Sequence, residues 1–261
     1  MIKLNNSEIY AFLLTMGAGL ATAIGSIIAL FAKQTNTKML ASSLGLSAGV
    51  MIYVSMVELY PKAIEYLSDF YGDFKGCTIA ALSFFAGIVI IGLIDYLIPT
   101  AEGDIGKMDD SDGLKKMGVI TALAIAIHNF PEGLVTFTSS FRDTGMGIMI
   151  AVAIAIHNIP EGISASLPIF YATGSRKKAF LTSLFSGLTE PLGAIAGYLI
   201  MRPFLTDALI GILFGSIAGI MMFISIEELL PMAREYEKSK LTILSVIAGM
   251  MIMAISLILF L

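Results

Sequence analysis

The sequence predicts an all-α integral membrane protein, in which eight transmembrane helices form an inverted repeat of three, two and three helices. Hydrophobic residues occupy 57% of the 261 positions and charged residues only 14%, and the mean hydropathy is +0.87. These values are too apolar for a chain that must cover itself with a water-soluble surface. The apolar residues form long runs, and two distant parts of the chain resemble each other. We therefore interpret residues 1–261 as a single transmembrane domain.

Eight apolar runs are about as long as a membrane-spanning helix requires, which is roughly 20 residues. The first run is interpreted as a retained helix and not as a cleaved signal peptide, because its apolar stretch continues to Phe31 and its start is weakly charged. The linkers between the runs are short. In chain order, the predicted spans are about 8–32, 39–60, 77–99, 118–139, 147–171, 178–201, 205–230 and 241–261.

The distribution of Lys and Arg between alternate loops predicts the orientation of these spans. One set of loops holds 11 of these residues and the other set holds 5. Cytoplasmic loops of membrane proteins carry the excess of positive charge. Both termini are therefore expected on the extracytoplasmic side.

The segment 45–66 aligns without gaps on the segment 215–236, which lies five predicted spans later. Weaker similarity links 82–87 to 244–249, and 19–25 to 187–193. Because five is an odd number, the two copies must cross the membrane in opposite directions. The prediction is an inverted repeat of about 8–99 and 178–261 around a central pair at about 118–171. Residues identical in both copies include Gly45 and Gly215, Gly49 and Gly219, Met51 and Met221, Ser55 and Ser225, Glu58 and Glu228, and Pro61 and Pro231.

An inverted repeat of this kind indicates transport as the leading class of function. Secondary transporters often consist of two inverted halves around a binding site at the centre of the bilayer. The alternative is that duplication and helix packing alone explain the match, since small residues such as Gly45 and Gly49 also suit close contacts between helices.

The central pair carries nearly the same ten residues twice, "AIAIHNFPEG" at 124–133 and "AIAIHNIPEG" at 153–162. At about 1.5 Å per residue, the His and Glu of both copies lie near the middle of a hydrocarbon layer of roughly 30 Å. Glu190, in "SGLTEPLG", reaches the same depth from the next span. Five ionisable side chains are therefore expected to converge at the midplane.

Each ionisable group at the bilayer centre costs about 2.5 kcal/mol or more, and a divalent cation would compensate several of them together. In each copy the His and Glu are four residues apart and share one helix face, and the Asn flanks that face. Alternatives remain open: a single His is often only a packing residue, and Asn and Glu can form hydrogen bonds between helices. The candidate metal ligands are His128, Asn129, Glu132, His157, Asn158, Glu161 and Glu190.

Five further residues have two possible roles. Glu58, Glu227 and Glu228 could attract cations at the two membrane faces, or could have only a structural or capping role. Asp95 is open in the same way. Met51 could be a soft metal ligand, but it is one of 16 methionines, which favours a core or lipid-facing role.

With these motifs, the chain resembles over its whole length the ZIP family of divalent metal transporters, and within it the bacterial zinc importers. The most specific elements are "HNFPEG", "HNIPEG" and "SGLTEPLGA". The resemblance implies an elevator-type carrier, often dimeric, in which the first, fourth, fifth and sixth helices move against the others. Many relatives carry a His-rich loop between the third and fourth helices, and the corresponding segment 100–117 contains no His.

The resemblance also implies a two-metal site at the midplane, in which carboxylates bridge the metals. One subsite, for zinc, would consist of Glu132, His157 and Glu161, with His128 nearby. The neighbouring subsite, often associated with iron(II), would consist of Asn129, Glu132, Asn158, Glu161 and Glu190.

Oxygen and imidazole donors suit zinc, iron(II), manganese, cobalt and cadmium, and the absence of thiolates argues against copper(I). These metals are expected as transported substrates and not as cofactors. The expected surroundings are the cytoplasmic membrane of a bacterium and a possible second copy of the chain, with no nucleic acid. The rival hypothesis is an intramembrane zinc metallohydrolase, but in metalloprotease motifs Glu directly follows the first His, whereas here Asn follows each His.

Overall fold

We describe the structure from a computed structural model, which places residues 6–31, 37–97, 111–142, 144–201, 206–237 and 240–259. Within these ranges the regular structure is entirely helical, and no strand occurs. The all-α class predicted from the apolar runs is confirmed.

The helices follow the apolar runs in chain order. The first part of the chain forms α1 (Asn6–Leu30), α2 (Thr37–Val54), the π-helical segment η1 (Ser55–Leu59), α3 (Tyr60–Tyr71), α4 (Asp73–Leu97) and α5 (Ser111–Arg142). The second part forms α6 (Thr144–Thr173), α7 (Arg176–Gly187), α8 (Thr189–Ala196), the π-helical segment η2 (Gly197–Met201), α9 (Asp207–Phe223), the π-helical segment η4 (Ile224–Leu229), α10 (Leu230–Tyr236) and α11 (Lys240–Leu259).

Seven helical segments among the described residues are long and apolar enough to cross a membrane. This finding confirms an integral membrane protein with several spans. Helix α5 has 32 residues but is not one of the seven, so the count of eight spans stays a prediction. Two spans are longer than the sequence predicts, because α2 continues through η1 and α3 to Tyr71, and α9 continues through η4 and α10 to Tyr236.

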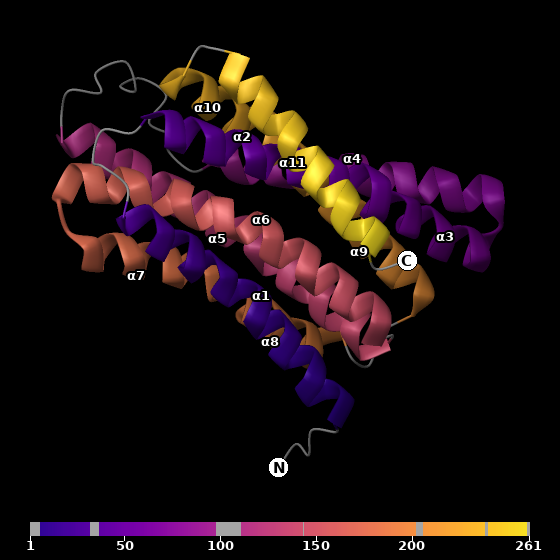
Figure 1. The fold of residues 1–261 in the computed structure, drawn as a ribbon. Coiled ribbons are helices and arrows are strands. Elements are labelled where there is room, and N and C mark those ends of the chain that lie inside the picture. Colours follow the sequence, from indigo (N-terminus) through magenta and orange to yellow (C-terminus); the bar gives the residue numbers. More distant parts are fainter. Residues whose placement is uncertain are drawn as a thin grey trace.

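The helices form two groups that lie side by side (Figure 1). The first group, here called the central bundle, contains α1, α5, α6, α7 and α8. The second, here called the flanking bundle, contains α2, α3, α4, α9, α10 and α11. The two groups meet mainly where α2 packs on α6, and to a smaller extent where α9 packs on α5. The two copies of the repeated decapeptide, on α5 and α6, therefore both lie in the central bundle.

Two glycines allow α1 and α6 to cross with their backbones in direct contact. A Cβ atom added at Gly25 would lie 1.9 Å from the carbonyl oxygen of Ile159, and one added at Gly162 would lie 1.9 Å from that of Thr22. No side chain fits at such distances, so only glycine permits this crossing. Gly162 is the last residue of the second decapeptide, and the crossing therefore fixes the helix turn that carries Glu161.

Helices α5 and α8 cross in a corresponding manner. A Cβ atom added at Gly133 would lie 1.9 Å from the carbonyl oxygen of Glu190, and one added at Gly193 would lie 2.0 Å from that of Phe130. Gly133 is the last residue of the first decapeptide. This crossing brings the backbone of Glu190 against the turn that carries Glu132, and so positions two of the predicted ligands.

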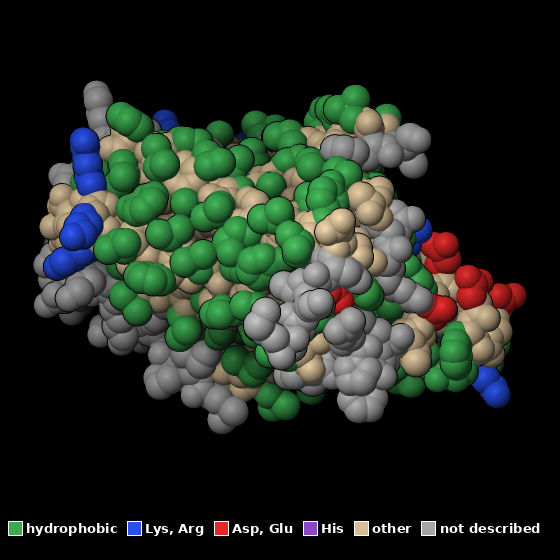
Figure 2. All heavy atoms as spheres, turned by 90° about the horizontal axis from the view of Figure 1, so that it is seen from below, with side chains coloured by type: hydrophobic (Ala, Val, Ile, Leu, Met, Phe, Trp, Pro, Cys, Tyr) green, Lys and Arg blue, Asp and Glu red, His purple; other side chains and the backbone are tan. Residues whose placement is uncertain are grey.

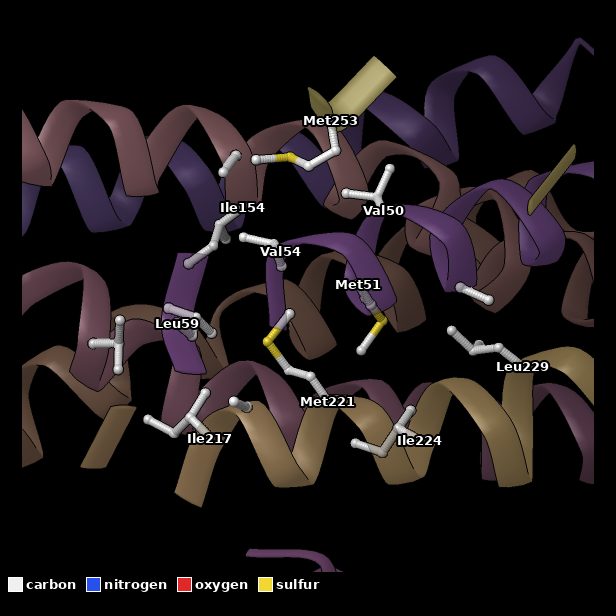
Figure 3. Packing of buried hydrophobic residues seen from close by; sticks show 14 of the residues in the cluster. Val50, Met51, Val54, Leu59, Ile154, Ile217, Met221, Ile224, Leu229 and Met253 are labelled. Atoms are coloured by element: carbon white, nitrogen blue, oxygen red, sulfur yellow. The ribbon is translucent and has the colours of Figure 1, made fainter. Parts of the chain in front are cut away.

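A buried hydrophobic core extends around α2 and α9 and includes Met51, Met221 and Ile154 of α6 (Figure 3). Each helix passes into a π-helical segment just after this methionine, η1 after α2 and η4 after α9. The hydroxyl of Ser55 donates to the carbonyl oxygen of Met51 at 2.7 Å, and that of Ser225 donates to Met221 at 2.7 Å. Thus residues that match in the sequence repeat also have matching local structure.

The surface viewed in Figure 2 is mainly hydrophobic, as expected for a face in contact with lipid. Lys and Arg side chains gather at its left end, and Asp and Glu side chains gather at its right end. The start of α7 lies at the left end in Figure 1, and α3 lies at the right end. Exposed basic residues at the start of α7 are Arg176, Lys177 and Lys178, and exposed acidic residues on α3 and at the start of α4 are Glu65, Asp69 and Asp73.

Candidate metal centre

A contact between the two decapeptides forms the centre of the site. The Nε2 atom of His157 on α6 lies 3.2 Å from the Oε2 atom of Glu132 on α5. The two side chains are fully buried, with exposed fractions of 0% and 1%. A buried ionisable pair is stable only when its polar atoms find partners, and this pair links α5 to α6 within the bundle.

Asn158 connects α6 to two other helices. Its Nδ2 atom donates to the carbonyl oxygen of Ala18 on α1 at 2.9 Å, and also donates to the Oε1 atom of Glu190 on α8. Glu190 lies in the first turn of α8, which follows a break in the helix at Leu188. The hydrogen bond from Asn158 holds the Glu190 side chain toward α6.

Asn129 occupies the matching place on α5. Its Nδ2 atom donates to the carbonyl oxygen of Ser186 on α7 at 3.4 Å, and the side chain is fully buried. In the sequence match that pairs Gly19 with Gly187, Ser186 corresponds to Ala18. The two Asn residues of the decapeptides therefore donate to corresponding backbone carbonyls of α7 and α1.

Glu161 receives a hydrogen bond from the flanking bundle. The hydroxyl of Ser47 on α2 donates to the Oε1 atom of Glu161 at 3.1 Å, and both side chains have exposed fractions of 0%. The same hydroxyl lies 3.9 Å from the sulfur of Met51. Glu161 therefore lies where α6 packs against α2, whereas Glu132 contacts α6.

Several oxygen atoms in this region are buried and have no hydrogen-bond partner among the described residues. Besides the hydroxyls of Thr22, Ser26 and Ser139, they include four acceptor oxygens of predicted metal ligands on α5, α6 and α8. Such atoms are costly in a low-dielectric interior unless a cation or donor approaches them. Four of them are Oδ1 of Asn129, Oε1 of Glu132, Oδ1 of Asn158 and Oε2 of Glu190.

The side chains do not form a closed metal cage in this structure. Among the described residues, no group of three or more His, Cys, Asp and Glu side chains is close enough to hold one ion. His128 lies on α5, but its side chain is outside the described residues. The structure thus brings the predicted ligands together as linked pairs, His157 with Glu132 and Asn158 with Glu190.

The residues with open roles lie outside these pairs. Met51 is fully buried beside Ser47. Glu58 lies in η1 and Glu227 and Glu228 lie in η4, both in the flanking bundle, and the side chain of Asp95 is outside the described residues. Their roles therefore stay open.

Sequence reasoning missed Ser47. Its only signal was a difference within the repeat, because Ile217 occupies the corresponding position of the second copy, although the residues around both positions match.

The fold and this site define a class: polytopic membrane proteins that bury a set of carboxylate, amide and imidazole donors among their spanning helices. The sequence model of the ZIP zinc transporter family matches residues 102–257 of the chain. The chain belongs to the ZIP zinc transporter family, as its motifs predict. Members of this family are transporters, which confirms that the protein is not an enzyme and removes the metallohydrolase alternative.

Known bacterial proteins resemble the chain over nearly its whole length. A zinc transporter ZupT from Oceanobacillus iheyensis is 54% identical, and the match covers 97% of this chain and 99% of the relative. The zinc transporter ZupT of Clostridium perfringens is 53% identical over 98% of this chain and 97% of the relative. The zinc transporter ZupT of Streptococcus mutans is 52% identical, and the match covers 96% of this chain and 97% of the relative. The predicted resemblance to bacterial ZupT-like proteins is therefore confirmed.

Proposed function

We propose that the protein takes up zinc across the cytoplasmic membrane of a bacterium, through a site for two metal ions between α5, α6 and α8. Membership of the ZIP zinc transporter family and the similarity to bacterial zinc transporters support zinc as the substrate. The donor set extends the proposal to iron(II), manganese, cobalt and cadmium, which accept the same oxygen and nitrogen ligands.

The observation that carries this proposal is the group of unpartnered buried oxygens. Asn129, Glu132, Asn158 and Glu190 each bury one acceptor atom that has no partner among the described residues. An amide or carboxylate oxygen without a donor is unfavourable in an apolar interior. A divalent cation removes this penalty for several oxygens together, and it can leave again because the ligands also have hydrogen-bond partners within the protein.

In the proposed site, two subsites share carboxylates. Glu132, His157 and Glu161 form the zinc subsite, with His128 nearby, and Asn129, Asn158 and Glu190 complete the second subsite with the same two carboxylates. The contact between His157 and Glu132 supports the first group. The hydrogen bond from Asn158 to Glu190 supports the second. Zinc accepts four ligands of this mixed type in a tetrahedral arrangement.

We further propose the eight-helix inverted repeat as the framework of this site. The paired π-helical segments η1 and η4 support it, as do the matching bonds from Asn158 to Ala18 and from Asn129 to Ser186. An inverted framework presents one midplane site to either side of the membrane in turn. The proposed repeats are 8–99 and 178–261 around the central pair 118–171.

The proposed orientation places both termini outside the cytoplasm. The basic start of α7 supports this orientation, because positive residues concentrate on the cytoplasmic side. In a variant with Cys77→Ser, labelling of Lys177→Cys by an impermeant maleimide in intact cells would test it, and labelling there would contradict it. We also expect a homodimer, which the mass of the purified protein in detergent would test.

Uptake into liposomes tests the proposed function directly. We would reconstitute the purified protein around a zinc-sensitive dye and compare it with Glu132→Ala and Glu161→Ala. We expect entry of zinc with the unaltered protein, and a loss of about 100-fold or more with each variant, because each removes a charged ligand from both proposed subsites. Absence of zinc entry with the unaltered protein would contradict the proposal.

A matched control shows whether transport is lost because a carboxylate of the site is removed or because any carboxylate is removed. Glu65 is 60% exposed and pairs only with the neighbouring Lys62 at 2.9 Å. The variant Glu65→Ala should transport like the unaltered protein, because exposed ion pairs contribute about 0–1 kcal/mol. If Glu65→Ala and Glu161→Ala lose transport equally, the loss does not come from the proposed site.

A further inference from the structure

Ser47 differs from most other buried Ser and Thr residues in these helices. A helical hydroxyl usually donates to the carbonyl oxygen four residues earlier in its own helix. On the same α2 span, Ser43 donates to Met39 at 2.9 Å and Ser55 donates to Met51 at 2.7 Å. The hydroxyl of Ser47 instead donates to a side chain of another bundle, at Glu161.

The hydrogen bond from Ser47 can fix the orientation of the Glu161 carboxylate. The two atoms are 3.1 Å apart, both side chains have exposed fractions of 0%, and the bond crosses the contact between α2 and α6. A hydrogen bond to a charged acceptor is stronger than one between neutral groups.

The second copy of the repeat has no hydroxyl at the position of Ser47. Position 217 corresponds to position 47, and it carries Ile217, a buried side chain that cannot donate. Helix α9, which carries Ile217, packs against α5. The Glu132 carboxylate on α5 contacts His157 within the central bundle. Of the two central carboxylates, Glu161 accepts a hydrogen bond from the flanking bundle, and Glu132 contacts His157 of its own bundle.

We propose that Ser47 is a positioning residue, which fixes the Glu161 carboxylate in the orientation that binds the transported cation. This inference deepens the proposed function and rests on it. Residues that hold a metal ligand in place typically change affinity by about 10–100-fold when they are removed. Ser47 acts through Glu161 and is not itself a ligand in this proposal.

The test compares Ser47→Ala with the control Ser43→Ala in the liposome assay. We expect Ser47→Ala to raise the KM for zinc about tenfold with a nearly unchanged maximal rate, because the bond orients a ligand before zinc binds. Ser43→Ala removes a hydroxyl from the same helix, one turn earlier, and should leave both values unchanged. Ser47→Thr keeps the hydroxyl and should restore most of the affinity.

A double-variant cycle separates positioning from a general effect on packing. Equilibrium zinc binding to purified protein would be measured for Ser47→Ala, Glu161→Ala and the double variant. We expect the Ser47 substitution to weaken binding only when Glu161 is present. An equal effect in both backgrounds, or a Ser47→Ala variant with the KM of the unaltered protein, would overturn the inference. Absence of zinc uptake by the unaltered protein would instead refute the proposed function.

Discussion

The two copies of the decapeptide differ in one residue but make different contacts. On α6, Asn158 bonds to α1 and α8, and Glu161 accepts a bond from α2. On α5, Asn129 has one longer bond to α7, and Glu132 contacts α6. The same local sequence therefore has different partners, because neighbouring helices determine what each polar group meets. The α6 copy connects both bundles through the bond from Ser47 to Glu161, whereas the contacts of Asn129 and Glu132 on α5 lie within the central bundle.

Both decapeptides end in a glycine at which two helices cross closely. Substitution of these glycines should have the largest effect on folding. We expect Gly162→Ala and Gly133→Ala to prevent normal folding, at a cost of about 4 kcal/mol or more, because each added Cβ would lie 1.9 Å from a backbone carbonyl oxygen. The measurement is the yield of monodisperse protein on size-exclusion chromatography in detergent.

Gly17 provides the matched control for these variants. A Cβ added there meets nothing within 4 Å, so Gly17→Ala on α1 should give a normal yield. If Gly162→Ala folds as well as Gly17→Ala, then the close crossing of α1 and α6 is wrong. If only one of Gly162→Ala and Gly133→Ala fails, the two crossings are not equivalent.

The two Asn residues should differ in their contribution to stability. We expect Asn158→Ala to lower the free energy of unfolding by about 2 kcal/mol and Asn129→Ala by about 1 kcal/mol, because Asn158 donates two hydrogen bonds and Asn129 donates one. Unfolding of the purified protein by a denaturing detergent would measure both values.

The same experiment shows which of the two Asn variants loses more stability. The order of the two variants matters more than their absolute values, because hydrogen bonds between membrane helices average about 0.6 kcal/mol in measured cases. An equal loss in the two variants would contradict the asymmetry between α5 and α6.

Much of this fold could be predicted from the sequence, because a membrane-spanning helix needs a long apolar run and little else. The helix boundaries were less predictable. The run ending near residue 60 continues to Tyr71, because the backbone stays helical through η1 and past Pro61. The break at Leu188, just before Glu190, lies where Pro191 cannot donate to the carbonyl oxygen of Gly187, and Gly187 packs against Gly19 there.

At the site, the candidate ligand residues could be predicted from the sequence, whereas their hydrogen-bond partners depend on how the helices pack. Buried polar residues in apolar spans are conspicuous, and the structure places all the predicted ligands with described side chains in the buried interior of the central bundle. Their partners could not be predicted, because carbonyl oxygens of Ala18 and Ser186 leave no trace in residue types. Ser47 was missed for a similar reason, since a single serine in an apolar helix usually bonds to its own backbone.

The single residue that differs between the decapeptides should have the smallest effect. The side chain of Phe130 is 42% exposed on α5, and Phe and Ile insert into membranes with similar free energies. We expect Phe130→Ile, which makes the two copies identical, to change the free energy of unfolding by less than about 0.5 kcal/mol and to leave the KM for zinc uptake unchanged.

The reverse substitution completes this test, because Ile159 is half-buried on α6 and its backbone lies against Gly25 of α1. A larger ring beside this crossing must displace neighbouring atoms, so Ile159→Phe should lower stability by about 1–3 kcal/mol. Unfolding and uptake of the two variants would be measured side by side. If Phe130→Ile alters uptake as strongly as Ile159→Phe alters stability, the ring of Phe130 takes part in the site, and the difference between the copies is functional and not only a consequence of packing.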